Sequence, residues 1–383
     1  MPHTISHQTL GSVNVRLAKF STGTDVDEYQ LALCIDDEAA HLSYAEQLRQ
    51  LCVAFETVRQ QTKANPVFKR YFISDAANQT TLLMNYELAY TDYELSVIEQ
   101  PPANGTKVAL WCYLMTNVNT KANVSGLYEV QHGSYRHLWS ANNTAQAETC
   151  SAQTKLLLND YVMQLMNEGC TLRDNCVRTW FYVNDIDQDY NDVVKARNEV
   201  FYTQGMNANT HFISSTGIGG RQADNQRLCQ MDSYAIYGLR EGQMRHLYAP
   251  DHLCRTVKYG VSFERGVYID YGDRRHVFIS GTASIDRDGN IVSQGDILGQ
   301  CERVWQNIEA LLNEANCEMK DLQMVICTIR HASDFNTVRQ WISHKIGNNV
   351  PHILVCAHIC RPNWLVEMEC IAARKIKSDY PVF

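Results

Sequence analysis

The chain has 383 residues, of which 45% are hydrophobic and 20% charged, and its formal net charge is -8. This composition is typical of an ordinary globular protein of two or three domains. The acidic balance disfavours nucleic acid or an anionic membrane as the main partner, although a few local arginines can still hold a small anion.

The sequence also predicts the compartment. The first residues, MPHTISHQ, lack the basic and apolar regions of a secretion signal, and no apolar run approaches the roughly 18 residues that a membrane helix needs. The 14 cysteines follow no framework spacing, which favours reduced thiols over disulfides. We therefore expect a cytoplasmic protein.

The first 120 residues are predicted to contain both strands and a helix. Short β-rich runs at 12–20 and 29–35 precede a helix over 36–63, where apolar residues recur at helical spacing, and a strand follows at 68–74. The segments 82–98 and 107–115 flank a Pro- and Gly-containing turn, which predicts an antiparallel pair.

After residue 130 the chain repeats itself. A β-rich run, an amphipathic helix, a strand, an acidic turn, a second helix and two last strands occur between about 137 and 238, and again in the same order between about 277 and 372. Agreement of order and element type at a fixed spacing indicates duplicated modules. We expect an α+β fold in which each module is a mixed β-sheet with helices packed on one face. The predicted division is an N-terminal extension (1–120) that partly completes the first module, a first module (121–245) and a second module (246–383).

The end of the second module carries two acidic residues on a strand. The β-rich runs 353–359 and 365–372 are joined by an Arg-Pro-Asn turn. Because side chains alternate along a strand, Glu367 and Glu369 share one face, and Val366 and Met368 the other. Carboxylates on so apolar a strand are costly unless they are used or paired, so the alternative to a catalytic role is a structural ion pair, for example with Arg361.

The second module resembles the Rid/YjgF family, which is chorismate-mutase-like in fold. The motifs that carry this resemblance are FISGTASI at 278–285, NIEALL at 307–312 and LVEMECIA at 365–372. The region before it is similar to the chorismatases, in which a diverged Rid-like domain precedes a Rid-like domain in one chain. The motifs here are RTWFY at 178–182, SSTGIG at 214–219 and YGVSFER at 259–265.

The chorismatase resemblance implies a reaction. Chorismatases release pyruvate from the enolpyruvyl ether of chorismate, which requires protonation of a methylene carbon. Glu367 matches the family's acid, and its apolar neighbours are of the kind that raise a carboxyl pKa. Glu369 is the second candidate, since a like charge nearby helps to keep one carboxyl protonated. The resemblance implies no cofactor.

Other residues follow from the same resemblance. Arg265 and Arg361 are the expected grips for substrate carboxylates, since arginine forms paired hydrogen bonds with them. The further expected substrate contacts are Tyr259, Tyr182, Arg178 and Ala283. For Arg178 and Tyr182, burial in the core between the modules is the alternative. Cys360 is shared with the hydroxybenzoate-forming chorismatases and favours 3-hydroxybenzoate as the product. Ala283 is not the glycine expected there, which leaves 4-hydroxybenzoate and a dihydroxycyclohexadiene carboxylate open.

Three rival interpretations remain. A Rid-type imine deaminase is disfavoured because His352 stands where that family has an arginine, and a non-catalytic binder of a small metabolite is the rival from another class. Cys356, His358 and Cys360 share a strand face, but side chains about 7 Å apart without a fourth ligand do not favour a metal site.

Rid proteins are trimers with clefts between subunits. Two fused modules leave two ways to close such a ring, a partner chain in a homo-oligomer or the N-terminal residues.

Overall fold

The structure is a computed structural model that describes residues 2–88 and 93–383, with the side chain of Tyr259 left out. Within this part of the chain, no helix is long and apolar enough to cross a membrane. The described residues form three six-stranded sheets, each with its own helices.

The first module is built from the N-terminal residues. Its sheet has the order β1-β2-β3-β6-β4-β5, with β4 and β5 parallel and the other neighbours antiparallel. Its elements are β1 (His3–Leu10), β2 (Val13–Phe20), β3 (Glu28–Ile35), α1 (Tyr44–Thr62), β4 (Asn65–Ile73), α2 (Ala76–Glu87), β5 (Glu94–Glu99) and β6 (Val108–Met115), with the 3-10 turn η1 (Asp37–Ala39).

The second module repeats this plan. Its sheet has the order β7-β8-β9-β12-β10-β11. Its elements are β7 (Asn119–Ala122), β8 (Tyr128–His132), β9 (Tyr135–Thr144), α3 (Cys150–Asn167), α4 (Leu172–Asn175), β10 (Cys176–Val183), α5 (Ile186–Thr203), β11 (Ser214–Gly219) and β12 (Cys229–Tyr237).

The third module has the same plan again. Its sheet has the order β13-β14-β15-β18-β16-β17. Its elements are β13 (Met244–Leu247), β14 (Gly266–Asp270), β15 (Arg274–Ala283), α6 (Ile297–Glu314), β16 (Leu322–Ile329), α7 (Phe335–Lys345), β17 (His352–Cys356) and β18 (Val366–Lys375), with the 3-10 turns η2 (Thr256–Tyr259), η3 (Met319–Asp321) and η4 (Ala332–Asp334).

The three modules agree in detail as well as in order. In each, the register between the fourth and fifth strands of the sheet, which are antiparallel, shifts at the same place: after Pro66 in β4, after Cys176 in β10 and after Leu322 in β16. A register irregularity at one matching position in three modules indicates that they are copies of one structural unit.

Two sequence-based expectations need correction. Residues 1–120 are not an extension that partly completes the first predicted module, because β1 to β6 form a sheet of their own. The segment 82–98 is not one strand of an antiparallel pair: α2 occupies Ala76–Glu87, and β5 pairs with β4 in parallel. The side chain of Asp75 accepts a hydrogen bond from the backbone N–H of Asn78, which caps α2 and favours helix over strand there.

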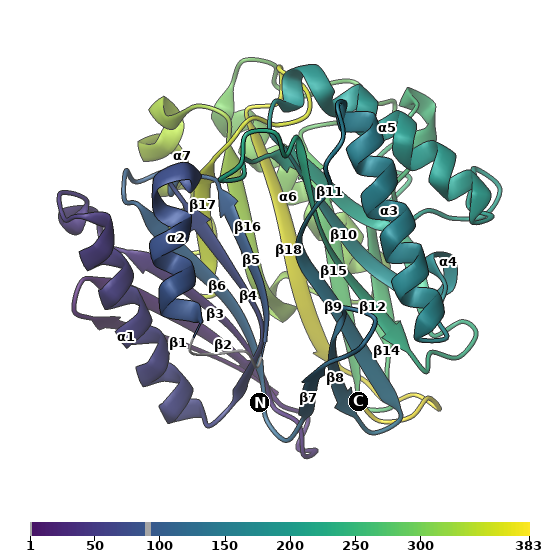
Figure 1. Cartoon of the computed structure of the whole chain (residues 1–383), viewed down its shortest axis with the longest axis horizontal. Coiled ribbons are helices and arrows are strands. Elements are labelled where there is room, and N and C mark those ends of the chain that lie inside the picture. Colours follow the sequence, from purple (N-terminus) through teal and green to yellow (C-terminus); the bar gives the residue numbers. More distant parts are fainter. Residues whose placement is uncertain (1, 89–92) are drawn as a thin grey trace.

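The modules form a closed ring within one chain. β5 of the first packs against β9 of the second, β11 of the second against β15 of the third, and β17 of the third against β3 of the first. Figure 1 shows the sheets facing one another across the middle, with α1 and α2 outside on one side and α3 and α5 on the other. Of the two ways to close a Rid-like ring, the N-terminal residues supply the third member.

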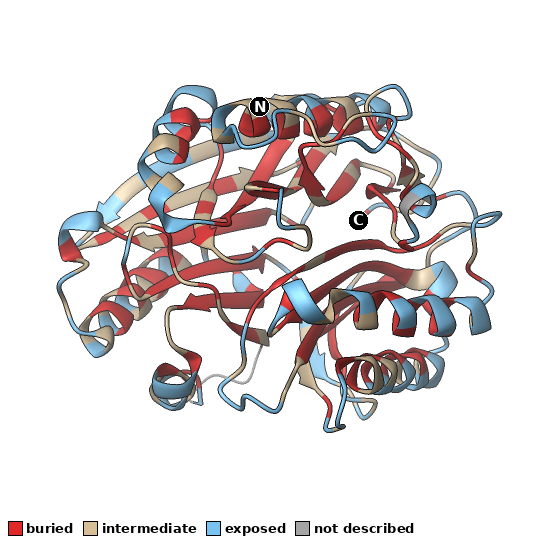
Figure 2. Ribbon diagram, turned by 90° about the horizontal axis from the view of Figure 1, so that it is seen from above, coloured by how far each residue is buried: buried red, intermediate tan, exposed pale blue. Residues whose placement is uncertain are grey.

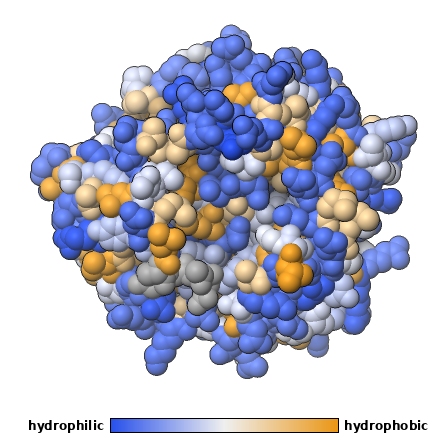
Figure 3. Space-filling view, in the orientation of Figure 1, coloured by the Kyte–Doolittle hydropathy of each residue, from blue (hydrophilic) through white to orange (hydrophobic). Residues whose placement is uncertain are grey.

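Burial follows this arrangement. Figure 2 shows strands that are almost wholly buried and helices whose outer faces are exposed. In the face drawn in Figure 3 most surface residues are hydrophilic, and hydrophobic ones are scattered among them, some of them near its middle. The exposed helix faces account for the sequence's amphipathic pattern.

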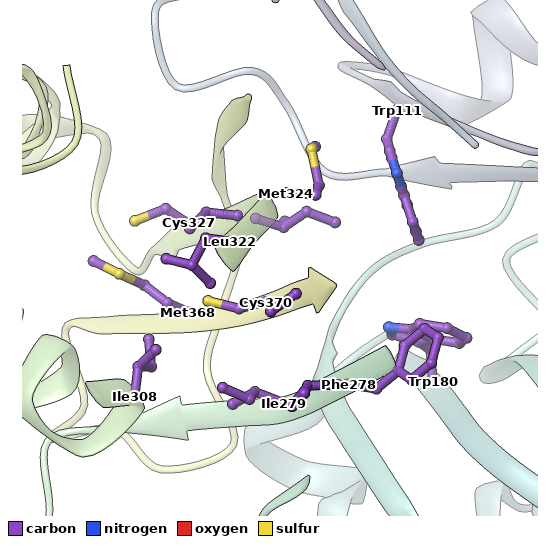
Figure 4. Packing of buried hydrophobic residues seen from close by; sticks show 14 of the residues in the cluster. Trp111, Trp180, Phe278, Ile279, Ile308, Leu322, Met324, Cys327, Met368 and Cys370 are labelled. Atoms are coloured by element: carbon purple, nitrogen blue, oxygen red, sulfur yellow. The ribbon is translucent and has the colours of Figure 1, made fainter. Parts of the chain in front are cut away.

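The inner faces of the three sheets share one core. Trp111 of β6, Trp180 of β10 and Phe278 of β15 belong to the same buried cluster, and the rings of Trp111 and Trp180 lie 6.3 Å apart. In Figure 4 these aromatic side chains lie in the space between the strands, and Ile308 of α6 lies on the side of β18 where Met368 and Cys370 point. Because each sheet is covered on both faces, polar side chains on the inner faces need partners within the protein.

Candidate active site

A cleft lies between the second and third modules. It is formed by α5 and β11 on one side, and by the segment before β14, the end of β15 and the start of β18 on the other. Its lining residues are Tyr190, Arg197, Ser215, Thr216, Gly217, Val261, Phe263, Arg265, Gly281, Ala283, Cys360, Arg361, Trp364 and Glu367. Four predicted site residues in addition to Glu367 therefore meet in one place: Arg265, Ala283, Cys360 and Arg361.

Glu367 is the acidic residue of this cleft. It lies near the start of β18, opposite Ala283 of β15 and Thr328 of β16, and its exposed fraction is 5%. Within the described part of the chain its carboxyl group makes no hydrogen bond. Burial, together with the nearby charge of Glu369, raises the pKa of Glu367 to about 8, against the opposing effect of Arg178 and Arg265. The carboxyl group is therefore mostly protonated at neutral pH.

Gly281 makes room for this carboxyl group. A Cβ atom at residue 281 would lie 2.8 Å from Cδ of Glu367 and 3.0 Å from Cγ2 of Thr216. The backbone N–H of Gly281 donates a hydrogen bond of 2.9 Å to Oγ1 of Thr216, which holds the end of β15 against β11. A side chain at this position would displace Glu367 or separate the two modules.

Glu369 has a different environment from Glu367. One of its carboxylate oxygens accepts hydrogen bonds from Arg178 (2.6 Å), from Oγ1 of Thr216 (2.7 Å) and from Nε1 of Trp180 (2.9 Å). Arg70 of the first module lies 3.8 Å from its other oxygen and also pairs with Asp232 of the second, at 2.9 Å. The ion-pair alternative therefore applies to Glu369, which joins the three modules, and not to Glu367.

Three arginines line the cleft around Glu367. Arg265 donates hydrogen bonds to the carbonyl oxygen of Cys254, the longer one 3.3 Å and the shorter 3.0 Å, and Arg361 lies over the ring of Trp364. Arg197 of α5 has an exposed fraction of only 1%; its Nε donates to Oγ of Ser262 (3.3 Å), but its Nη2 has no hydrogen-bond partner. A buried guanidinium nitrogen without a partner is costly and is well suited to receive an anion.

Arg197 and Tyr190 line the cleft but are not among the site residues predicted from the sequence. Arg197 lies four residues after Val193 and three before Val200, both buried, so it occupies the apolar stripe of α5. An arginine within such a stripe was the available signal. Nothing in the sequence singled out Tyr190, whose ring packs against Gly217 so closely that a Cβ there would lie 2.9 Å from it.

Cys360 lies beside both Tyr190 and Glu367. Burial, and to a lesser extent the charge of Glu367, raises the pKa of the Cys360 thiol, so it is present as the neutral thiol. His358, two residues earlier, is directed away: its Nδ1 lies 2.7 Å from Oδ2 of Asp187 on α5. Among the described residues, no three Cys, His, Asp or Glu side chains are grouped to hold a metal ion.

The other predicted site residues lie elsewhere. Along β10, Trp180 and Tyr182 belong to the core between the sheets, on the same strand face as Arg178, whereas Phe181 and Val183 belong to the core under the helices. Tyr182 lines a small inner cavity that Glu367 and Glu369 also line, and Arg178 forms an ion pair with Glu369. The side chain of Tyr259 is outside the described residues. His352 was compared with an arginine of the Rid cleft, but it lines a different cavity, between the third and first modules.

Comparisons with known proteins agree with this architecture. Residues 264–374 match the family model described as Endoribonuclease L-PSP. A RutC family protein of Pyrococcus abyssi is 31% identical over 101 residues, which cover 26% of this chain and 79% of that protein. A chorismatase of Streptomyces rapamycinicus is 25% identical over 220 residues, which cover 51% of this chain and 63% of that protein.

Among solved structures, the crystal structure of a chorismatase has the same fold. It superposes with a TM-score of 0.62 at 18% sequence identity, covering 80% of this chain and 92% of the other. The fold therefore extends beyond the region of the family model and includes much of the first two modules.

Proposed function

The chain belongs to the RutC family through its C-terminal module, and we propose that it is a chorismatase-like enzyme that cleaves the enolpyruvyl ether of chorismate and releases pyruvate. The proposal rests on one observation above all: a buried, unpaired carboxyl group, Glu367, with its pKa raised to about 8, lies in a cleft that contains three arginines. The likeness to a chorismatase in sequence and in fold supports it.

Glu367 is the proposed general acid. Breaking an enol ether begins with a proton on its terminal methylene carbon, which leaves an oxocarbenium-like centre open to attack by oxygen. Protonating carbon requires an acid that is protonated at the working pH and fixed against the methylene group. Glu369 is a positioning residue in this account, because its negative charge raises the pKa of Glu367 while Arg178 and Thr216 hold it in place.

The arginines are the proposed binding groups. Chorismate is a dicarboxylate, and the chain as a whole is acidic, so the cleft must supply the positive charge locally. Arg197, Arg265 and Arg361 line the same cleft as Glu367 and can pair with two carboxylates. The proposed reaction uses no cofactor.

3-Hydroxybenzoate is the proposed ring product. Cys360 supports this, because it stands next to Glu367 as a neutral thiol and is shared with the hydroxybenzoate-forming relatives. A hydroxybenzoate and pyruvate together contain all the atoms of chorismate, whereas a dihydroxycyclohexadiene carboxylate and pyruvate contain one water more.

Incubation of the purified protein with chorismate tests the proposal. Pyruvate is measured by a coupled lactate dehydrogenase assay, and the ring product is identified by chromatography and mass spectrometry. We expect pyruvate and 3-hydroxybenzoate in equal amounts. 4-Hydroxybenzoate or the diene diol would overturn the product assignment and keep the reaction class.

The Glu367→Gln variant separates an enzyme from a binding protein. Gln has the same shape but cannot deliver the proton, so turnover should fall at least 1000-fold while chorismate still binds, as measured by calorimetry. Binding without turnover by the unaltered protein would favour a metabolite-binding role. Turnover of imines but not of chorismate would favour the deaminase alternative.

A further inference from the structure

A second cleft lies between the third and first modules. It encloses a cavity of about 430 Å³ between α7 and β17 on one side and β2 and β3 on the other. Because the modules form a ring of three like units, this cavity occupies the place that the Glu367 cleft occupies between the second and third modules.

The strand registers give the matching positions. Arg265 and Gly266 precede and begin β14, and Gly266 pairs with Ile279, which pairs with Cys370 of β18. In the first module Leu17 of β2 pairs with Leu31 of β3, which pairs with Cys112 of β6, so Leu17 matches Gly266. Arg16, one residue before Leu17, therefore matches Arg265.

The position of the acid is matched in the same way. Glu367 pairs with Thr328, one residue before the end of β16, and Ala109 pairs with Phe72, one residue before the end of β4. Both Arg16 and Ala109 line the 430 Å³ cavity. This cleft thus contains the arginine of the Glu367 cleft without its acid.

The fold itself does not require that arginine. In the second module Asp232 matches Glu369, because it pairs with Trp180 as Glu369 pairs with Ile326. The same register assigns Gln230 to the position of Glu367, and continued two residues beyond the start of β8 it brings Gly126, in the turn before β8, to the position of Arg16. The guanidinium group of Arg16 is therefore a specific feature of the cleft between the third and first modules.

The charges of the cavity favour one anion. Arg339 and Asp37, both in its lining, pair with each other. Burial lowers the pKa of His352 to about 4, with Arg16 contributing, so the imidazole is neutral at pH 7. Nε of Arg16 is buried and has no hydrogen-bond partner, so one positive charge remains uncompensated among the described lining residues.

The remaining lining combines polar side chains, among them Asn14, Asn104, Ser343 and Asn348, with an apolar wall that suits a ring. Ile35, Pro102, Phe335 and Ile342 line the cavity beside Arg16. A ligand that places one carboxylate at the guanidinium and a ring against these side chains would satisfy both parts of the lining. We propose that this cleft is a second, non-catalytic site that binds a small ring-bearing monocarboxylate.

The test uses benzoate as the probe and the full-length chain. Benzoate binding is measured by calorimetry and, with 4-fluorobenzoate, by ¹⁹F NMR, for the unaltered protein and for Arg16→Gln, with Arg265→Gln as the matched control in the other cleft. We expect Arg16→Gln to weaken one benzoate site at least tenfold and Arg265→Gln to leave that site intact. The thermal midpoint of each variant verifies folding.

Two further measurements make the result decisive. The first is the Ala109→Leu variant, which should fill part of the cavity and weaken benzoate binding at this site without removing a charge. The second is the binding of benzyl alcohol, which lacks the carboxylate and should bind at least tenfold more weakly than benzoate. Equal benzoate affinity in Arg16→Gln and the unaltered protein would overturn the proposal, as would equal affinity for benzyl alcohol. Neither result depends on turnover of chorismate, so the second site and the proposed reaction fail or stand separately.

Discussion

The carboxyl group of Glu367 lies where a side chain on residue 281 would stand, since a Cβ at Gly281 would be 2.8 Å from Cδ of Glu367. Gly281→Ala should therefore displace the carboxyl group. A shift of about 1 Å in an acid that must meet one carbon atom is expected to lower kcat about 100-fold. Steady-state kinetics with chorismate measures the effect.

Gly266→Ala is the matched control. It crowds the same sheet, since its Cβ would meet the carbonyl oxygen of Phe278 at 3.0 Å, but it does not contact Glu367. We expect a loss of stability with kcat nearly unchanged. Equal losses of kcat in both variants would mean that general strain in the sheet, and not the placement of Glu367, limits the rate.

A second prediction concerns the buried ion pair. Glu369→Met should destabilise the protein by about 3–5 kcal/mol, because it leaves the guanidinium of Arg178 buried without its carboxylate. Arg178→Met should have a similar effect, and the double variant should be more stable than the sum of the two predicts. Urea unfolding of the four proteins measures this, and strictly additive losses would show that the pair is not coupled.

The pH dependence of stability follows from Glu367. Its folded-state pKa of about 8 is above its ordinary value, so between about pH 4.5 and pH 8 the folded state binds the proton more tightly than the unfolded state. The contribution of Glu367 to stability is therefore full below this window and is lost as the pH rises through it. Compared with the unaltered protein, Glu367→Gln should become relatively more stable with rising pH. Denaturant unfolding at pH 5 and pH 8.5 measures the difference, and parallel pH profiles would contradict the assigned pKa shift.

The pH dependence of the reaction has the same origin. A general acid must be protonated, so kcat/KM for chorismate should fall above about pH 8. Glu369→Gln removes the like charge that helps to raise this pKa, so the falling limb should move to lower pH. If kcat/KM of the variant falls at the same pH as that of the unaltered protein, Glu369 does not raise the pKa of Glu367.

Arg197 provides a test of substrate binding. Arg197→Gln removes the guanidinium whose Nη2 is buried and unpartnered, and we expect kcat/KM to fall about 100-fold, as for loss of a charge-assisted contact to a carboxylate. Arg303 is the matched control, since it donates to backbone carbonyls of Ile285 and His252 outside the cleft lining. Arg303→Gln should affect stability more than kcat/KM.

The sequence predicted the repeated part of the fold well and the N-terminal part poorly. Periodicity and matching residues identified the second and third modules, and the alternation along β18 placed Glu367 and Glu369 on one face. The first module carries no motif that resembles the others, and its likeness appears only in the strand order and the shared register shift after Pro66. Residue types alone could not reveal that.

The site shows a similar division. The resemblance to a family selected Glu367, Arg265 and Arg361, which meet in one cleft. The alternation along the strand, without the resemblance, could not separate Glu367 from Glu369, because the partners of Glu369 come from β10 and β11, far away in the chain. That His352 and Glu367 line different cavities could not be predicted either, since it follows from a ring in which the two edges of each module face different neighbours.

The release of pyruvate from chorismate tests the central claim most directly. The account predicts rapid release by the unaltered protein and at least a 1000-fold slower rate for Glu367→Gln, with chorismate still bound by the variant. No pyruvate at micromolar enzyme, or an unchanged rate in Glu367→Gln, would contradict it.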